Sequence, residues 1–554
     1  MADRVDVDAV VIGSGAGGMT CAVALAQAGM KVVVLEQHYL PGGWCHSFTL
    51  GDGYRFSPGV HYIGELGPGG RTRRIYEGLG MGGDLAFVEL NPDGYDHILV
   101  GDDRFDIPRG KDAFAERLCA RFPYERAGIH RYLDICERLA RELEEMDRVE
   151  SWKDAVKLPL KVPTLLRHGL LSTQRLVDGC VSDPLLKAIL LGQVGDHGVP
   201  PSQAPAALHG SVAAHYFEGG WYPRGGAYTI PRAYLRALRK AGGELRVRTK
   251  VERILTEGRR AIGVRLADGT EIRARHIVSN ADPGVTYGQL VPKEAQSRGL
   301  RRRLDRVNWS TSCLSLFMAA EFDAKALGID SGNYWIYDRP NIDEVYRWGM
   351  QPWRDMKTLP GFFLTVTTLK DPGKQRHGHH TMEAFTFVGH DAYREWQNTT
   401  MEDRPDAYKA LKEKLLGLMI ATAGKVIPDL ADKVRFAELG TPLTNDFYCA
   451  ASAGNLYGTH KTLGQLGPFS WPIETELPGL TMCGASTIAH GVLGASMSGV
   501  FAARSILGVR TREILAPKGA ELTLLTAEQA AEQGKKGPRR PRPEDDLGLE
   551  APAM

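Results

Sequence analysis

Residues 7–18 read VDAVVIGSGAGG, and this stretch decides the fold. The run from Val5 to Ile12 is short, apolar and rich in β-branched residues, which predicts a buried strand of a parallel sheet. An alanine-rich segment, Met19 to Ala28, follows the glycines and predicts a helix. Lys31 to Leu35 predicts the next strand, which closes with Glu36.

The glycines match the Gly-x-Gly-x-x-Gly fingerprint of dinucleotide-binding folds, in its strand–turn–helix–strand setting and with an acidic residue about 20 positions later. Such glycines let the backbone approach a pyrophosphate at the N-terminus of a helix. We expect Glu36 to accept hydrogen bonds from the hydroxyls of the adenosine ribose. The residues expected to hold the dinucleotide at this turn are Gly13, Ser14, Gly15, Ala16, Gly17 and Gly18. A second match, Gly78 to Gly83, follows a predicted helix instead of a strand, so we expect a single dinucleotide-binding fold.

The composition is that of a globular protein with more than one lobe. The chain has 554 residues, too many for one small domain, and 43% of them are hydrophobic and 24% charged. Lys and Arg (68) nearly balance Asp and Glu (66), so the net charge of +2 gives no general reason to bind nucleic acid. The eight cysteines form no Cys-x-x-Cys pair, which suits a reducing compartment and offers no zinc site. His377, His379 and His380 lack a Cys or an acid at ligand spacing, so we expect a solvated loop and no metal.

Residues 9–30 and 477–503 lack Asp, Glu, Lys and Arg, but glycine groups interrupt both, so neither is expected to span a membrane. Acidic residues precede the first stretch where a secretory signal would carry basic ones, and we expect a cytoplasmic protein. Residues 155–181 mix Leu and Val with basic residues around a single acid, Asp178, a pattern typical of a segment that lies on anionic lipid. A basic-faced helix packed on the core would give the same pattern.

Three further segments resemble the FAD enzymes of the amine oxidase and carotenoid desaturase superfamily. Pro41-Gly42-Gly43 resembles their Gly-Gly doublet, which lies along the FAD phosphates and the ribityl chain. A predicted hairpin before residues 277–283 resembles the desaturase hairpin whose backbone touches the adenine. Residues 477–494 resemble the C-terminal motif, a strand and then a helix that begins with glycine under the flavin. The resemblance therefore implies that further residues hold FAD, and these are Gln37, Gly42, Gly43, Val251, Gly484, Ala485, Gly491 and Val492.

The same resemblance implies an α/β protein with a single Rossmann-type FAD-binding domain built from discontinuous segments, and an α+β substrate-binding domain. The FAD-binding domain is expected to comprise residues 1–84, 201–290 and 470–510. Residues 85–200 and 291–469 are then expected to form the substrate-binding domain. Residues 511–554 form a C-terminal extension. From about residue 527 it turns polar and rich in charge and proline, and we expect disorder there.

Within this superfamily the chain most resembles the retinol saturases (all-trans-retinol 13,14-reductases) and their bacterial relatives. The segments that carry this resemblance are Glu36–His38, Gly42–Phe48, Gly59–Gly64 and His215–Gly226. Phytoene desaturases usually carry Arg after the doublet and a Thr-His-Pro-Gly loop near the C-terminus, where this chain has Trp44-Cys45-His46 and Thr487–Gly491. The resemblance implies an FAD-dependent oxidoreductase that saturates a carbon–carbon double bond of a retinoid, carotenoid or other isoprenoid polyene. The alternatives are a carotenoid or phytoene desaturase, a cis–trans isomerase and, without flavin chemistry, a prenyl-binding escort-like protein.

Saturation of a double bond needs a hydride, which a flavin can pass on, and a proton from a pocket residue or from water. The candidate donors, each of which would also suit a structural role, are His46, His61, Tyr62, Tyr448, Tyr457 and His490. We expect His61 and Tyr62 to be catalytic because they lie in a saturase-like segment, and His490 because it lies in the expected flavin-facing loop. The substrate should occupy an apolar tunnel. Without a second dinucleotide motif, NAD(P)H would bind elsewhere or another carrier would supply the electrons.

Overall fold

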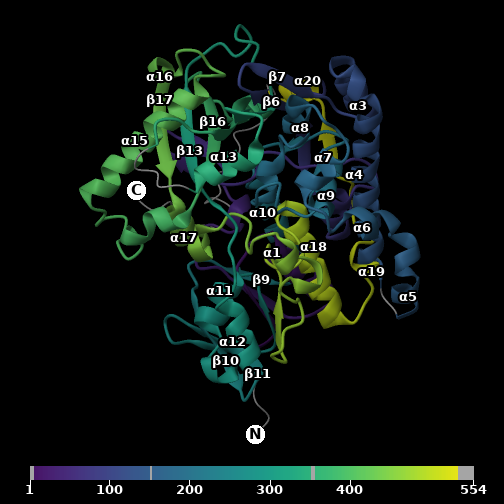
Figure 1. Cartoon of the computed structure of the whole chain (residues 1–554). Helices are drawn as coiled ribbons and strands as arrows, with labels where there is room; N and C mark the ends of the chain where they lie inside the picture. Colours follow the sequence, from purple (N-terminus) through teal and green to yellow (C-terminus); the bar gives the residue numbers. More distant parts are fainter. Residues whose placement is uncertain (1–4, 150–151, 351–355, 535–554) are drawn as a thin grey trace.

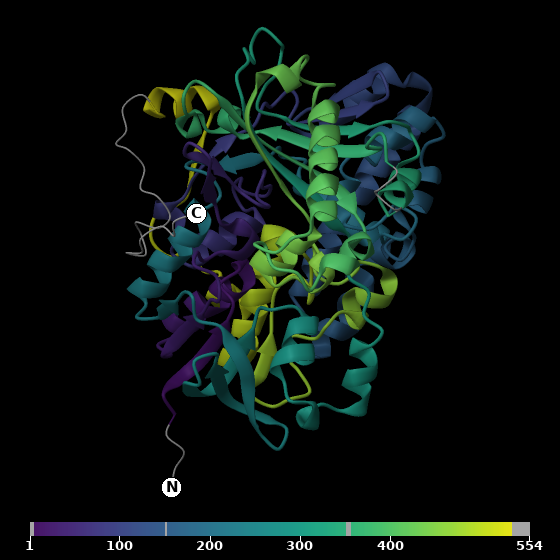
Figure 2. The same ribbon diagram turned by 90° about the vertical axis from the view of Figure 1, so that its left-hand side faces the viewer.

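The computed structural model describes residues 5–149, 152–350 and 356–534. Two large sheets, each of seven strands, dominate the structure. In Figure 1 the first lies in the lower half, toward the N-terminus, and the second lies above it. Figure 2 shows the same two halves from the side.

The first sheet has the topology of a dinucleotide-binding fold. Strands β18, β12, β1, β2 and β9 run parallel in that order, and the antiparallel hairpin of β10 and β11 continues the sheet beside the start of β12. Its strands are β1 (Val7–Ile12), β2 (Val32–Leu35), β9 (Glu244–Arg246), β10 (Val251–Glu257), β11 (Arg260–Leu266), β12 (Glu271–Ser279) and β18 (Leu480–Met482). In β1, Ala9, Val10 and Val11 are fully buried, as an uninterrupted apolar run predicts for a central parallel strand.

Three helices pack beside this sheet and fix the turn after β1. They are α1 (Ala16–Gln27), α10 (Thr229–Lys240) and α18 (Gly491–Leu507). Small residues let α1 and α18 meet backbone to backbone, because a Cβ added at Gly499 would lie 2.1 Å from the carbonyl oxygen of Gly17. The first turns of α1 and α18 therefore lie close to the carboxyl ends of β1 and β12. This is the edge at which α/β sheets bind their ligands.

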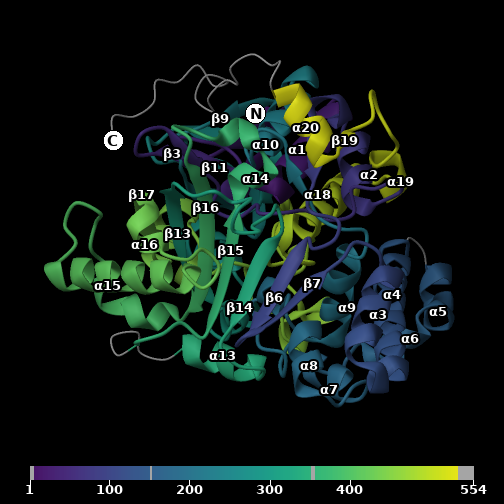
Figure 3. The ribbon, with the colours of Figure 1, turned by 90° about the horizontal axis from the view of Figure 1, so that it is seen from above.

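The second sheet is mixed and has the order β17-β13-β16-β15-β14-β6-β7, in which only the β14–β6 pair is parallel. Its strands are β6 (Asp96–Val100), β7 (Asp103–Ile107), β13 (Ser312–Ala320), β14 (Asn333–Tyr337), β15 (Gly361–Val366), β16 (His380–Val388) and β17 (Val434–Gly440). Figure 3 shows α15 (Asp406–Ala423) at one end of this sheet and α3, α4 and α9 at the other.

The remaining elements flank the sheets or connect them. The helices beside the β7 end of the second sheet are α3 (Lys111–Arg121), α4 (Arg126–Asp147), α5 (Trp152–Lys161), α6 (Pro163–His168), α7 (Thr173–Asp178), α8 (Pro184–Leu190) and α9 (Ala206–His215). The other helices are α2 (Arg71–Gly78), α11 (Pro283–Val285), α12 (Arg298–Leu304), α13 (Ile342–Gly349), α14 (Thr367–Lys370), α16 (Leu430–Lys433), α17 (Pro442–Cys449) and α19 (Thr511–Ile514). A small hairpin joins β3 (Phe48–Leu50) and β4 (Tyr54–Phe56).

The strands of the first sheet come from all three segments predicted for the FAD-binding domain, and those of the second come from the segments predicted for the substrate-binding domain. The exact domain boundaries stay predictions. Among the described helices, none is long and apolar enough to cross a membrane.

The predicted disorder from residue 527 is wrong for residues 527–534, which form helix α20 (Ala527–Gly534). Before it, β19 (Thr523–Leu525) pairs in parallel with β5 (Ala86–Glu89), which also pairs with β8 (Trp221–Pro223). Thr526 and Gln529 exchange hydrogen bonds at the start of α20, and Ala530 is buried against Val88 and Leu525. The reciprocal cap and this small apolar contact order a segment whose composition is polar. Residues 535–554 lie outside the described part of the chain.

Residues 155–181 do not behave as one surface segment. Leu176, Val177 and Val181 are buried in the core beside α4 and α8, so the part from α7 onward has no free apolar face. The earlier part, which forms α5 and α6, keeps large apolar side chains in solvent, with Leu160 85% exposed. Only this earlier part can serve as the predicted lipid-binding surface.

Candidate functional site

One cavity of about 1360 Å³ is lined by residues of both large sheets and of the loops between them. Pockets for one small ligand have volumes of about 300–1,000 Å³, so this cavity has room for a dinucleotide and a second molecule. The loops after β1 and β2, together with Val251 of β10, line one part of the cavity. Phe363 of β15 and Phe385 of β16 line another part.

Two helices direct their N-termini at this cavity. Gly15, which has no side chain, is the N-cap of α1, and His490, whose side chain does not cap the helix, is the N-cap of α18. Gly15, Gly491 and Val492 line the cavity. The first N–H groups of a helix have no partner within it and carry partial positive charge, so two uncapped N-termini in one cavity suit an anionic pyrophosphate.

Close packing leaves space for backbone alone at the turn after β1. A Cβ added at Gly17 would lie 2.7 Å from Asn280 Oδ1 and 2.8 Å from the carbonyl oxygen of Ala495. Gly13 has a φ of +89°, which favours glycine. The turn therefore presents its amides to the cavity without intervening side chains, which fits the predicted phosphate site.

Gly18 is an exception among the residues predicted to hold the cofactor, because it does not line the cavity. A Cβ added there would lie 2.3 Å from the carbonyl oxygen of Gly13, and the Gly18 N–H donates to Asn280 Oδ1 at 2.9 Å. This glycine is needed for the close approach of α1 to β1, and we assign it a packing role. The predicted cofactor residues that do line the cavity are Gly13, Ser14, Gly15, Ala16, Gly17, Glu36, Gln37, Gly42, Gly43, Val251, Gly484, Ala485, Gly491 and Val492.

The carboxylate of Glu36 lies at the end of β2, is 8% exposed, and lines the same cavity. The Ser14 N–H and hydroxyl both donate to Oε2, at 2.9 and 2.6 Å, and the His38 N–H donates to Oε1 at 2.8 Å. These bonds hold the carboxylate in place, and a carboxylate oxygen can accept further hydrogen bonds. Glu36 is thus oriented as an acceptor for ribose hydroxyls.

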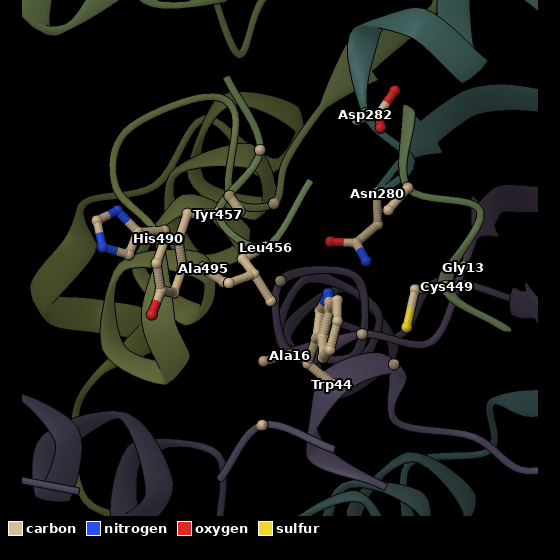
Figure 4. A pocket seen from close by; sticks show the side chains of 18 of the residues that line it. Gly13, Ala16, Trp44, Asn280, Asp282, Cys449, Leu456, Tyr457, His490 and Ala495 are labelled. Atoms are coloured by element: carbon tan, nitrogen blue, oxygen red, sulfur yellow. The ribbon is translucent and has the colours of Figure 1, made fainter. Parts of the chain in front are cut away.

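All six predicted proton-donor candidates line the cavity, but they do not gather at one point. The rings of Tyr457 and His490 lie 4.5 Å apart, and Figure 4 shows them together on one side of the pocket, across from Asn280 and Asp282. The rings of His46 and Tyr448 instead lie 5.3 and 5.5 Å from that of His38, just after Glu36. They therefore belong to the part of the cavity that the adenosine end of the cofactor would occupy.

The electrostatic setting keeps His61 and His490 neutral near pH 7. Burial, with the charges of Lys370 and Lys374, lowers the pKa of His61 to about 3. Burial and Lys461 lower the pKa of His490 to about 3. A neutral imidazole is a weak acid, so the two histidines predicted as proton donors are poorly suited to that role.

The structure adds two carboxyl groups that the sequence analysis missed. The hydroxyl of Tyr62 lies 3.0 Å from Asp96 Oδ2 and 3.2 Å from Asp196 Oδ2, and the two carboxyls share its one donated hydrogen. Asp196 lines the cavity beside Tyr62. Burial and the charge of Asp96 raise the pKa of Asp196 to about 7, and burial raises the pKa of Asp96 to about 6. Asp196 stands in a largely apolar stretch, which is a weak signal in the sequence, whereas Asp96 follows Asp93 and Tyr95, and 100 residues separate the two acids.

Within residues 5–149, 152–350 and 356–534, no group of three or more His, Cys, Asp or Glu side chains is placed to hold a metal ion. In the histidine loop, His379 Nδ1 pairs with the hydroxyl of Tyr54 at 2.7 Å and His380 Nδ1 with that of Thr368 at 2.9 Å. These histidines thus have protein partners.

Comparisons with known proteins agree with this geometry. The family model described as flavin containing amine oxidoreductase matches residues 16–507. An all-trans-retinol 13,14-reductase of Danio rerio is 30% identical over 534 residues, which cover 92% of this chain and 87% of the relative. A chloroplastic prolycopene isomerase of Daucus carota is 26% identical, with 90% of this chain and 80% of the relative covered. The crystal structure of an oxidoreductase from Methanosarcina mazei aligns with a TM-score of 0.59 at 17% identity, covering 91% of this chain and all (100%) of that one, and so shows the fold.

Replacing Glu36 tests the predicted ribose contact. In Glu36→Ala the ribose hydroxyls of FAD lose their acceptor. An unpaired partner costs about 1–3 kcal/mol of binding free energy, so we expect FAD to bind about 5- to 150-fold more weakly. Titration of apoprotein with FAD measures this.

The matched control is Glu142→Ala, since Glu142 is also a buried carboxylate that accepts two backbone N–H bonds, from Thr164 and Leu165, but it lies outside the cavity. This control should lower the melting temperature and leave FAD affinity unchanged. Equal FAD affinity of wild type and Glu36→Ala would refute the assignment.

Proposed function

The chain belongs to the flavin-containing amine oxidoreductases, in the branch of the all-trans-retinol 13,14-reductases, and we propose that it saturates a carbon–carbon double bond of an isoprenoid polyene. Membership establishes the predicted α/β fold, the FAD cofactor and the oxidoreductase class. The proposal adds the substrate class, a retinoid or carotenoid, and the direction, which is reduction.

The observation that carries the proposal is the apolar part of the cavity next to Tyr62. Its lining side chains include Leu208, Val212, Tyr216, Phe363 and Phe385. The rings of Phe363 and Phe385 stack at 4.7 Å, and that of Tyr216 stacks on Tyr62 at 4.3 Å. Flat aromatic surfaces with few polar groups suit a conjugated hydrocarbon chain. The relative from Danio rerio is a reductase of all-trans-retinol, which is such a molecule.

When FAD is bound, it supplies the hydride transfer, and the protein must orient the polyene, exclude water and provide a proton. The residues that would hold the cofactor are the turn after β1, Glu36, the Gly42–Gly43 doublet and the first turn of α18. Reduction consumes two electrons per double bond. NAD(P)H or another electron carrier would supply them. The described residues form only one sheet of the dinucleotide-binding type, which FAD would occupy, so the carrier would bind elsewhere.

Isomerisation is the second candidate, and the 26% identity to a prolycopene isomerase favours it. The same apolar cavity would accept a carotenoid with one cis double bond. Desaturation uses the same groups in the opposite direction. The mass of the product separates these reactions.

Helices α5 and α6 support a further part of the proposal, a surface that binds membranes. Val156, Leu160, Leu166 and Leu170 are 63–85% exposed. Basic residues such as Lys157 and Arg167 accompany them, and Figures 1 and 3 place α5 at the outer edge of the molecule. Leucines with lysines and arginines bind anionic lipid. A cytoplasmic protein with this surface would collect its apolar substrate from the bilayer.

Product analysis tests the reaction. The FAD-loaded protein, reduced without oxygen and mixed with all-trans-retinol or a carotenoid, should give a product heavier by two hydrogens. Mass spectrometry after chromatography is the measurement. A product lighter by two hydrogens would establish desaturation, and an unchanged mass with altered retention would establish isomerisation; either result on the whole panel overturns the proposal.

Flotation with liposomes tests the membrane surface. The variant Lys157→Glu/Leu160→Asn/Arg167→Glu should float less with anionic vesicles than wild type, and added salt should reduce binding of the wild type, since screening acts over about 10 Å at 0.1 M.

A charge-matched control is Arg301→Glu/Arg302→Glu on α12, where both residues are exposed. It should float like the wild type. Equal flotation of all three proteins would exclude α5 and α6 as the binding surface.

A further inference from the structure

We propose that Asp196 is the catalytic acid that protonates the polyene, that Asp96 is a positioning residue whose charge keeps the proton on Asp196, and that Tyr62 is a positioning residue that holds the Asp196 carboxyl in place. The inference rests on the proposed saturation. In that reaction one carbon would receive the hydride that the bound, reduced cofactor supplies, while the O–H bond of Asp196 breaks and its proton adds to the neighbouring carbon. Asp196 is left as a carboxylate and regains its proton from water. The oxidised cofactor is reduced again by a nicotinamide or another electron carrier.

Asp196 lies where the two segments predicted to flank the chemistry meet. Its side chain accepts from Tyr62 of the saturase-like segment at 3.2 Å, and its backbone carbonyl accepts a hydrogen bond from Nε2 of His490 in the flavin-facing loop. Asp196, Tyr62 and His490 all line the cavity. An acid at this junction is adjacent to both the cofactor part and the apolar part of the cavity.

The hydrogen bonds decide which of the two carboxyls carries the proton. Asp96 is fully buried and accepts from three side chains, from Asn333 at 2.8 Å, from Gln193 at 2.6 Å and from Tyr62 at 3.0 Å. Asp196 accepts from one side chain, that of Tyr62. Donated hydrogen bonds stabilise a carboxylate, so the negative charge belongs on Asp96 and the proton on Asp196. The two acids titrate as a pair.

Lys370, whose pKa burial lowers to about 7, supports the charge on Asp96 in its protonated form. Lys370 is 1% exposed, and its ammonium donates to the side-chain oxygen of Asn333, whose amide in turn donates to Asp96. The charge of Lys370 lowers the pKa of Asp96 against the effect of burial. Among the described residues, no such series of hydrogen bonds from a lysine reaches Asp196, and the charge of Asp96 raises the pKa of Asp196.

Apart from Asp96, the groups near Asp196 are poorer proton donors near pH 7. Burial raises the pKa of Tyr62 well above its usual value, and the two carboxyls raise it further because a phenolate there would stand between them. The titratable groups that face Asp196 from the surrounding elements are Tyr62, Asp96, Tyr216, Tyr337, Tyr346, Tyr457 and His490. Among them, only the two carboxyls titrate near neutral pH. Behind Asp96, burial lowers the pKa of Lys370 to about 7 as well.

Single-turnover kinetics separate this role from cofactor binding. Photoreduced Asp196→Asn, free of oxygen, should transfer hydride to all-trans-retinol or a carotenoid about 10²- to 10⁴-fold more slowly than wild type. Its FAD content, melting temperature and photoreduction should stay unchanged. Asp330→Asn is the control, because Asp330 pairs with His97 outside the cavity, and it should react like the wild type.

The pH dependence gives a signature that a structural role would not produce. The wild-type rate should fall as pH rises through about 7, where Asp196 loses its proton. Asp96→Asn removes a neighbouring negative charge, so the pKa of Asp196 decreases and the fall moves to lower pH. Tyr62→Phe removes the hydrogen bond that stabilises the Asp196 carboxylate, so the fall moves to higher pH.

Each outcome decides the proposal. A slow Asp196→Asn and opposite pH shifts in the two positioning variants support it. If the wild type saturates the polyene and Asp196→Asn transfers hydride at the same rate, the inference is overturned and the proposed function stands. A wild type whose product has not gained two hydrogens overturns the proposed function and, with it, this inference.

Discussion

The side chain of Asn280 is the contact on which the site depends. Added Cβ atoms would lie 2.7 Å from its amide at both Gly15 and Gly17, and 3.1 Å from its Oδ1 at Gly484. The turn after β1, the end of β12 and the loop before α18 thus close around one side chain, although the sequence separates them by more than 200 residues at each step. Because this packing leaves no space for a Cβ, the amides at the start of α1 face the cavity, and the phosphate site follows from it.

Much of the cofactor site could be predicted because its signals are local. The strand, the glycines and Glu36 stand within one unit of 30 residues, and their spacing has a direct physical meaning. The catalytic site has no such local signal. Asp96 and Asp196 come from different elements, and only the fold places both on the hydroxyl of Tyr62. The position of His61 in the cavity was predicted, but its low pKa depends on Lys370 and Lys374, whose burial the sequence does not reveal.

Predictions from average composition were wrong where a few individual contacts outweighed it. The polar segment after residue 526 forms a helix because of one reciprocal cap and one buried alanine. Residues 155–181 divide between surface and core, and the difference lies in which leucines α4 and α8 cover. In each case the average over a window hides the individual contacts that decide the structure.

We propose that one cavity holds FAD and a polyene in contact, so that electrons pass between them. The most direct measurement is to photoreduce the protein without oxygen, add one equivalent of all-trans-retinol or of a carotenoid, and record the flavin and polyene absorbance together. We predict that oxidised flavin returns while the polyene loses one conjugated double bond per flavin. A flavin that stays reduced with every polyene of the panel would exclude electron transfer between the two molecules.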